Sequence, residues 1–340
     1  MIPIKFNTLD ELAINHYDYL CNKLNFSIKK RINFSKNKFK HEKGNIYEEY
    51  YILLEYLDEN LKDIILGKPS ILEFHKLELL KKSKSFDFAK KKEDKKQEQN
   101  EILEDLNSIF NYTCFSFPGF SKTTKKKKVS YSGYDFIQNL NINTCVYCNR
   151  NTIYNLNKSN KRTSELDHFY PKSKYPYFAL SFYNLVPSCK VCNKLKLDKD
   201  ERKYINPYDH RFNFHKSIKF KLKIKDSTFY YSKDGFSISF SFNNNVKLDE
   251  KRRIVNSIKL FELKDLYENH KDTILELIQK SQVYTDTYIN ELFKQYEGTL
   301  FNNREDLIRL ITCGYMNDED LNNRPLSKLI KDISENLKLY

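Results

Sequence analysis

Two Cys-x-x-Cys pairs constrain the fold of this 340-residue chain more than any other feature of its sequence. Cys145 and Cys148 form the first pair, and Cys189 and Cys192 form the second. Four thiolates at this spacing are typical of a closed, tetrahedral Zn²⁺ site, which stabilises a fold and leaves no position open for a substrate. We therefore expect the residues between the pairs to form a small subdomain held by a structural zinc ion. Four unrelated cysteines in a reduced core would have no reason to repeat this spacing.

The remaining sequence indicates a reducing compartment. The chain has 7 cysteines, an odd number, and its first residues include no apolar signal segment. No apolar run approaches the roughly 18 residues that a membrane span needs. We expect a cytoplasmic protein with no membrane partner, and there paired cysteines favour metal binding over disulfides.

Two polar residues between the cysteine pairs suggest chemistry at a phosphate. Asp167 and His168 have apolar flanks, which predicts a strand with these two side chains on opposite faces. Asp is a hard oxygen ligand for Mg²⁺, and His is the side chain best able to accept a proton near neutral pH. A second short strand is predicted at residues 184–187, and a helix at residues 190–197. An Asp-His dipeptide alone is weak evidence for a catalytic site, and the predicted strand and helix that follow make it stronger evidence.

This order of strand, loop, strand and helix resembles the HNH endonuclease superfamily, in its treble-clef form with four zinc-binding cysteines. The resemblance covers residues 145–198 and implies a ββα-metal core. The shared motif stands in this chain as Asp167-His168, Pro171, Asn184-Leu185, Cys189, Cys192-Asn193 and Lys196.

The resemblance implies a role for each polar position of the motif. Asp167 and Asn193 would bind the catalytic divalent ion, and His168 would activate the attacking water. Asn184 would hold the loop between the strands and so aim His168. Many relatives have His where this chain has Asn193. The oxygen-rich ligand set that results favours Mg²⁺ or Mn²⁺ over Zn²⁺ or Ni²⁺ in the catalytic position.

The activity that the resemblance implies is metal-dependent hydrolysis of phosphodiester bonds in DNA, and the choice between DNA and RNA stays open. Similar HNH proteins look like effectors of bacterial anti-phage systems, some of them encoded beside an SMC-like ATPase in the Septu arrangement. The resemblance thus implies a defence role and an SMC-like ATPase partner. Restriction of modified DNA and a mobile-element nuclease are the other roles to consider.

The charge of the chain favours a polyanionic partner only where the basic residues cluster. With 59 Lys and Arg against 45 Asp and Glu, the formal net charge is +14. A codon bias that enriches Lys, Asn, Ile, Tyr and Phe produces basic chains without any partner. Lysines do gather in the motif, however, and lysines neutralise phosphates. We expect nucleic-acid contacts from Lys172, Lys174, Lys190, Lys194 and Lys196, and a further phosphate contact from the run Lys125–Lys128.

The rest of the chain is predicted to be mostly helical, because it contains only 7 Gly and 8 Pro. A capping box at Thr8 opens a helix whose i, i+3, i+4 rhythm places His16 in the core. Two further helices are expected, one over residues 46–66 and one that begins with a capping box at Ser70 and carries Phe74, Leu77 and Leu80.

After the motif, apolar and polar residues alternate on both sides of the turn Lys233-Asp-Gly235, which predicts an antiparallel hairpin, and helices follow. The predicted fold class is α+β, with a small zinc-stabilised ββα-metal core inside mostly α-helical flanks. We expect an N-terminal helical region at residues 1–120, the nuclease domain at 121–215, and the hairpin with a C-terminal helical region at 216–340.

Two other functions compete with the nuclease. A zinc-knuckle protein that binds nucleic acid without cutting needs only the cysteines and lysines, and it stays the alternative. A zinc deaminase is suggested by Pro187-Ser-Cys189, but His168 is not followed by the x-Glu that this signature requires, so we reject it. His210 and His215 follow the motif and are candidates to assist at the scissile phosphate.

Overall fold

The chain divides into two compact units, each built from separated segments. The computed structural model describes residues 1–23, 27–86, 88, 97–116, 131–158, 161–199, 201–212 and 214–339, so the predicted phosphate contact at Lys125–Lys128 lies outside the described residues. One unit, here called the cleft unit, consists of Lys5–Asn141 and Tyr154–Glu201. The other, here called the hairpin unit, consists of Met1–Ile4, Ile142–Ile153 and Arg202–Tyr340.

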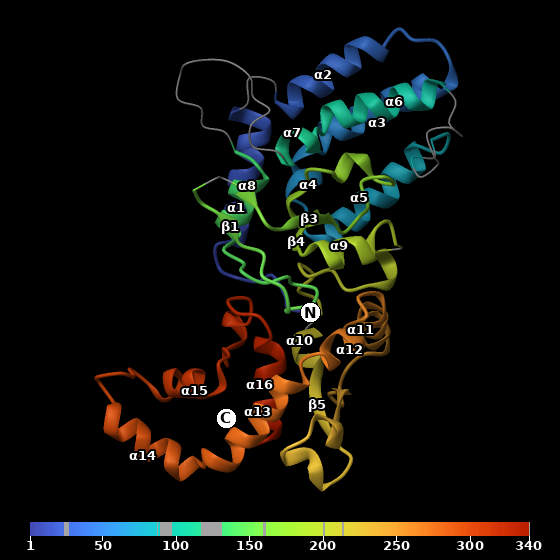
Figure 1. The fold of residues 1–340 in the computed structure, drawn as a ribbon. Coiled ribbons are helices and arrows are strands. Elements are labelled where there is room, and N and C mark those ends of the chain that lie inside the picture. The colour runs from blue at the N-terminus through green and yellow to red at the C-terminus, as the bar shows by residue number, and fades with distance from the viewer. Residues whose placement is uncertain are drawn as a thin grey trace. The chain divides into compact units, whose positions relative to one another are not determined.

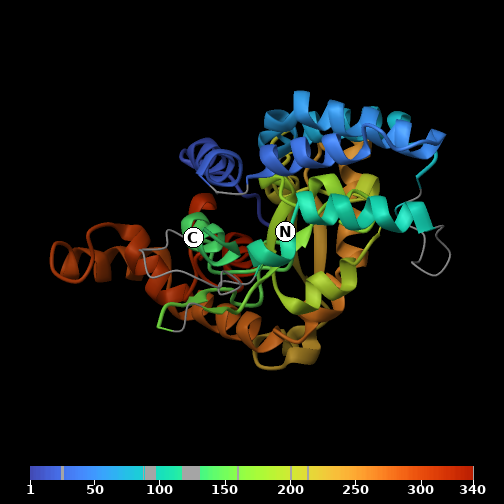
Figure 2. The same ribbon diagram turned by 90° about the horizontal axis from the view of Figure 1, so that it is seen from above.

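Helices form most of the cleft unit. The α2 and α3 helices run side by side, and α6 packs against α2 (Figures 1 and 2). Their buried faces consist mostly of aliphatic and aromatic residues at helical spacing, as an amphipathic helix requires. The helices are α1 (Leu9–Asp18), α2 (Ile28–Phe39), α3 (Asn45–Glu59), α4 (Leu61–Leu66), α5 (Pro69–Lys82), α6 (Gln97–Ile109), α7 (Tyr112–Ser116), α8 (Gly133–Leu140) and α9 (Lys190–Lys196).

Two short antiparallel ladders complete the cleft unit. The first joins β1 (Asn155–Leu156) to β2 (Lys161–Arg162). The second joins β3 (Glu165–His168) to β4 (Leu185–Ser188), and α9 packs against β3 (Figure 1). The predicted order of strand, strand and helix within the motif is therefore confirmed.

The hairpin unit is built on the predicted hairpin. Strands β5 (Ile218–Ile224) and β6 (Phe236–Phe242) pair antiparallel along their whole length, and α16 packs against β5. The helices of this unit are α10 (Phe214–Ser217), α11 (Leu248–Leu260), α12 (Leu263–Glu268), α13 (Lys271–Val283), α14 (Asp286–Tyr296), α15 (Arg304–Thr312) and α16 (Ser327–Asn336). The described chain is thus mostly helical with small antiparallel hairpins, as expected.

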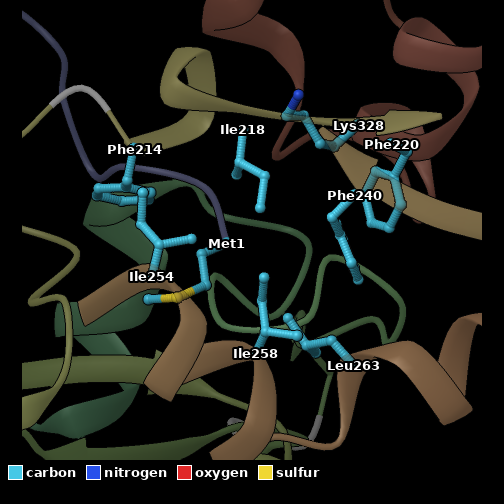
Figure 3. Close-up of a pocket in the computed structure, with 9 residues that line it drawn as sticks. All are labelled: Met1, Phe214, Ile218, Phe220, Phe240, Ile254, Ile258, Leu263 and Lys328. Atoms are coloured by element: carbon cyan, nitrogen blue, oxygen red, sulfur yellow. The ribbon is translucent and has the colours of Figure 1, made fainter. Parts of the chain in front are cut away.

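A small cavity lies in the apolar core of the hairpin unit. Ile218 of β5 and Ile258 of α11 point into it from opposite sides, and the Lys328 stem lies at its edge (Figure 3). Its volume is about 30 Å³, which is room for a water molecule or two. The cavity is a packing gap in the core and has no room for a larger ligand.

The structure corrects three predictions about the N-terminal helices. Thr8 has φ −89° and ψ 4° rather than the extended backbone of a capping residue, and its side chain makes no capping bond. The helix expected over residues 46–66 is interrupted at Asn60, where φ is −107° and ψ is 14°. The α5 helix begins at Pro69 rather than with a cap at Ser70, as suits a proline at the first helical position.

The α5 helix is apolar on two faces. Leu72 and Leu79 are buried in the cleft unit. The other apolar face, which carries the Phe74, Leu77 and Leu80 noted in the sequence, is exposed. The exposed residues are Ile71, Phe74, Leu77 and Leu80. Among the described helices of both units, none is long and apolar enough to cross a membrane.

Candidate functional site

The four motif cysteines come together as predicted. Their sulfur atoms lie within 4.8 Å of one another, and all four side chains are buried. Four sulfur donors in one closed cluster are a ligand set that Zn²⁺ prefers in structural sites. The cluster is therefore compatible with a structural zinc ion.

Local hydrogen bonds shape each Cys-x-x-Cys turn. In the first turn, Asn149 adopts a left-handed backbone with φ 51°, and its N–H donates to the Cys145 carbonyl over 2.7 Å. The Tyr267 hydroxyl donates to the Cys148 carbonyl. In the second turn, Cys189 is the N-cap residue of α9, and its carbonyl accepts from the Asn193 N–H over 3.0 Å. The same backbone that positions the Cys189 and Cys192 thiols thus positions Asn193 in the first turn of the helix.

A cleft of about 660 Å³ opens in the cleft unit, lined by residues of α7, β3, α9 and the loop after β3. Asp167 and His168 of β3 both line it, and so does Asn193 of α9. The loop contributes Lys172, and α7 contributes Tyr112. Three of the four residues that the sequence predicted to be catalytic therefore share one cleft.

His168 is held by one ring nitrogen. Its Nε2 atom lies 3.0 Å from the Ala179 carbonyl oxygen, and because a carbonyl can only accept, Nε2 carries the proton. The ring packs edge-on against Tyr112, with 4.4 Å between ring centroids. Among the described residues, Nδ1 has no hydrogen-bond partner. The neutral ring therefore has one lone pair for chemistry in the cleft.

Burial keeps this imidazole neutral. Loss of hydration lowers the pKa of His168 to about 3, and the nearby positive charges of Lys172 and Lys196 act in the same direction. The hydrogen bond to Ala179 opposes this shift without reversing it. At neutral pH the ring is therefore unprotonated at Nδ1.

Asn184, the fourth predicted residue, braces the loop between β3 and β4 instead of lining the cleft. Its side chain is fully buried, and its Oδ1 atom accepts from the Tyr170 N–H over 2.6 Å. Its Nδ2 atom donates to the Phe178 carbonyl over 2.9 Å and to the Tyr170 carbonyl over 3.2 Å. One side chain thereby ties the start of the loop to Phe178, the residue before Ala179.

The five lysines predicted to contact nucleic acid occupy different environments. Lys190 and Lys194 of α9 are exposed. Lys174 donates to the backbone carbonyl of Asp198 over 2.6 Å. Lys172 lies in the cleft and, as burial costs its charged form hydration, its pKa is lowered. These four ammonium groups stay candidates for phosphate contacts.

Lys196 differs from the other four. Its side chain is 1 % exposed and is not among the residues that line the cleft. The Nζ atom lies 3.3 Å from Oδ1 of Asp167 and 3.2 Å from Oδ2, and it donates to the His168 carbonyl over 2.7 Å. The ammonium group therefore faces the predicted metal ligand.

The two histidines after the motif have partners within the hairpin unit. His210 donates from Nε2 to the Ile4 carbonyl over 3.0 Å. His215 lies 3.6 Å from Asp318, and burial lowers the pKa of His215 to about 4. Assistance from either one at a phosphate stays a prediction.

Tyr112 and Glu165 are among the residues of the cleft that sequence reasoning missed. Tyr112 packs on His168 and donates its hydroxyl to the Leu166 carbonyl over 3.2 Å. Glu165 begins β3 and also lines the cleft. Glu165 precedes the Asp-His pair by two positions and could have been found there, whereas nothing around Tyr112 in the sequence signals its place.

One curated protein shares a segment with this chain. It is described as "Septu protein PtuB" from Bacillus thuringiensis and is 40% identical over 87 residues. The match covers 25% of this chain and 32% of that relative, so it spans about a third of the relative's length. No protein-family model and no solved structure matches the chain. A quarter of this chain is thus similar to part of a Septu protein.

Proposed function

We propose that this protein is a metal-dependent endonuclease that hydrolyses phosphodiester bonds in DNA as an effector of bacterial anti-phage defence. The observation that carries the proposal is that Asp167, Asn193 and the neutral imidazole of His168 line one cleft, with Nδ1 of the imidazole unprotonated. The partial similarity to a Septu protein supports the defence role.

Asp167 and Asn193 suit a hard divalent ion. Their side chains offer a carboxylate and an amide oxygen, and oxygen donors are what Mg²⁺ and Mn²⁺ prefer. Both residues line a cleft with ample room for an ion and its waters. An ion bound there supplies charge stabilisation to the phosphorus centre and the leaving oxygen.

His168 acts as the general base. Nδ1 accepts a proton from a water molecule that attacks phosphorus, a contribution of about 10²–10⁴-fold in rate. The Nε2–H bond to Ala179 fixes both the tautomer and the ring orientation. The edge of Tyr112 restricts rotation of the ring from one side.

Asn184 positions the base indirectly. It ties Tyr170 and Phe178 together, and Ala179 follows directly on Phe178. The Ala179 carbonyl, which accepts the hydrogen bond from the His168 Nε2–H, is thereby held in place. A change at Asn184 moves His168 without removing any group that touches the substrate.

The basic residues supply substrate binding. Lys172 lines the cleft, and Lys190 and Lys194 are exposed on α9, a short distance along the chain from Asn193. They suit a phosphate backbone that passes the cleft. An SMC-like ATPase is the partner we propose from the Septu similarity.

The experiment uses full-length, zinc-loaded protein on plasmid DNA with Mg²⁺, Mn²⁺ or EDTA. We expect cutting that depends on the added ion, with 5′ phosphate and 3′ hydroxyl ends, and no cutting by His168→Ala at unchanged zinc content and helicity. DNA binding without cutting by wild-type protein would favour the zinc-knuckle alternative. Cutting by His168→Ala at the wild-type rate would remove the proposed base.

A further inference from the structure

A buried ammonium group lies against the carboxylate that is proposed to hold the catalytic ion. Asp167 is 3 % exposed and Lys196 is 1 % exposed, and the Lys196 Nζ atom is 3.2 to 3.3 Å from both carboxylate oxygens. The ammonium group is also held by the His168 carbonyl and lies 5.6 Å from the centre of the Phe169 ring. Lys196 is therefore fixed in place and cannot reach solvent without breaking these contacts.

This pair matters because the proposed ion ligands carry little charge. Asn193 is neutral, and Asp167 contributes a single negative charge that it shares with Lys196. A divalent cation that binds Asp167 must therefore approach an ammonium group already on the same carboxylate. Charges this close interact strongly inside a protein, where water screens them poorly.

We propose that Lys196 keeps the affinity of the Asp167–Asn193 site for a divalent ion low until a nucleic-acid phosphate enters the cleft, so that ion and substrate bind cooperatively. The inference rests on the proposed nuclease function. The phosphate brings the negative charge that the ligand set lacks, and by linkage the ion then raises the affinity for the phosphate by the same factor. A free protein of this design holds its zinc but little catalytic ion.

The competing explanation makes Lys196 a clamp that only orients Asp167. The two explanations predict opposite signs for the loss of the charge. A lost clamp weakens ion binding, as loss of groups that orient metal ligands commonly does by about 10–100-fold. A lost opposing charge strengthens it.

The experiment measures Mn²⁺ affinity of the full-length, zinc-loaded protein by electron paramagnetic resonance of the free ion. All proteins carry His168→Ala, so that DNA stays intact. We expect Lys196→Met to bind Mn²⁺ about tenfold or more tightly without DNA, as removal of one nearby charge implies. Lys196→Arg keeps the charge and should bind as weakly as the parent.

DNA provides the second arm. Addition of a short duplex should raise the Mn²⁺ affinity of the parent at least about tenfold, a typical size for coupling between two sites. The gain should shrink in Lys196→Met. Asp167→Asn should abolish the Mn²⁺ binding of the parent, which assigns the bound ion to this site.

Weaker Mn²⁺ binding by Lys196→Met would overturn the proposal in favour of the clamp. If Lys196→Met does not fold, the parent protein still tests the proposal. Equal Mn²⁺ affinity of the parent with and without DNA would also overturn the proposed cooperativity. Failure of the nuclease assignment is seen separately, as absence of cutting by the protein with His168 intact at saturating Mn²⁺. Cutting together with unchanged affinity in Lys196→Met would reject this inference alone.

Discussion

His16, which is buried, and His168, which is partly buried, use neighbouring carbonyl groups of the cleft unit but lie in different surroundings. His16 donates from Nε2 to the Leu180 carbonyl over 2.8 Å, and His168 donates from Nε2 to the Ala179 carbonyl over 3.0 Å. Burial lowers the pKa of His16 to about 4 and that of His168 to about 3. By tautomer and by charge state the two rings are alike.

The second ring nitrogen separates them. Nδ1 of His16 accepts from the Tyr131 hydroxyl over 3.0 Å, and four aromatic rings pack edge-on around this fully buried imidazole. Nδ1 of His168 has no hydrogen-bond partner among the described residues, and its ring lines the cleft. A lowered pKa therefore does not distinguish a reactive histidine from a structural one in this protein. The surroundings of the unprotonated Nδ1 atom do distinguish the two histidines.

The largest expected effect is on the cutting rate of His168→Ala. Removal of the base should lower the rate by about 10²–10⁴-fold. His168→Ala should lower the melting temperature of the protein much less than His16→Ala does, because the His168 ring borders a cleft rather than a closed core. Initial rates on plasmid DNA and thermal denaturation measure the two quantities. Equal loss of stability in both variants would break the comparison.

His16→Ala should have the reverse effect. The substitution opens a cavity among four rings and leaves the Leu180 carbonyl without its donor, so we expect a loss of about 3–5 kcal/mol in the free energy of unfolding. Urea denaturation measures that loss. The cutting rate per folded molecule should stay within twofold or so of wild type, since no reacting group is removed. A larger drop would mean that His16 contributes to the cleft.

Acid should destabilise the protein partly through His16. The ordinary pKa of His is about 6.5, and the folded value for His16 is about 4, so the unfolded chain binds its proton more readily. The stability that neutral His16 contributes is complete above about pH 6.5 and is lost as the pH falls toward 4, up to about 3 kcal/mol.

The matched control for this pH effect is His16→Gln, which keeps an N–H donor and cannot titrate. Urea denaturation at pH 7.5 and 4.5 should show a smaller decline in the variant than in wild type. All other titrating groups are common to both proteins, so their effects cancel in the difference. Parallel declines would contradict a neutral His16 in the core.

The sequence anticipated both histidines but not what surrounds them. The helical rhythm placed His16 on a buried face, and the Asp-His pair between predicted strands marked His168, because both signals are local. Tyr112 and Tyr131 were not identified, since their contacts join distant parts of the chain. The depth of Lys196 was missed for the same reason, because a lysine in the last turn of a short helix usually reaches solvent.

For the fold, too, local sequence signals predict some elements but not how they pack. Residues 218–224 and 236–242 alternate visibly and form the predicted hairpin. By contrast, α5 has apolar residues on two faces, and periodicity alone does not say which one the cleft unit covers. Burial of a two-faced helix is decided by its neighbours rather than by its own pattern.

The smallest effects are expected from Tyr131→Phe and Tyr112→Phe. The first removes the donor to Nδ1 of His16 and should cost about 1 kcal/mol of stability at unchanged cutting rate. The second removes a hydroxyl that donates to the Leu166 carbonyl but keeps the ring that packs on His168, so cutting should also persist. Urea denaturation and initial cutting rates test both. A tenfold loss of rate in Tyr112→Phe alone would mean that its hydroxyl takes part in the chemistry, and that the reactive region extends beyond the face of His168 onto α7.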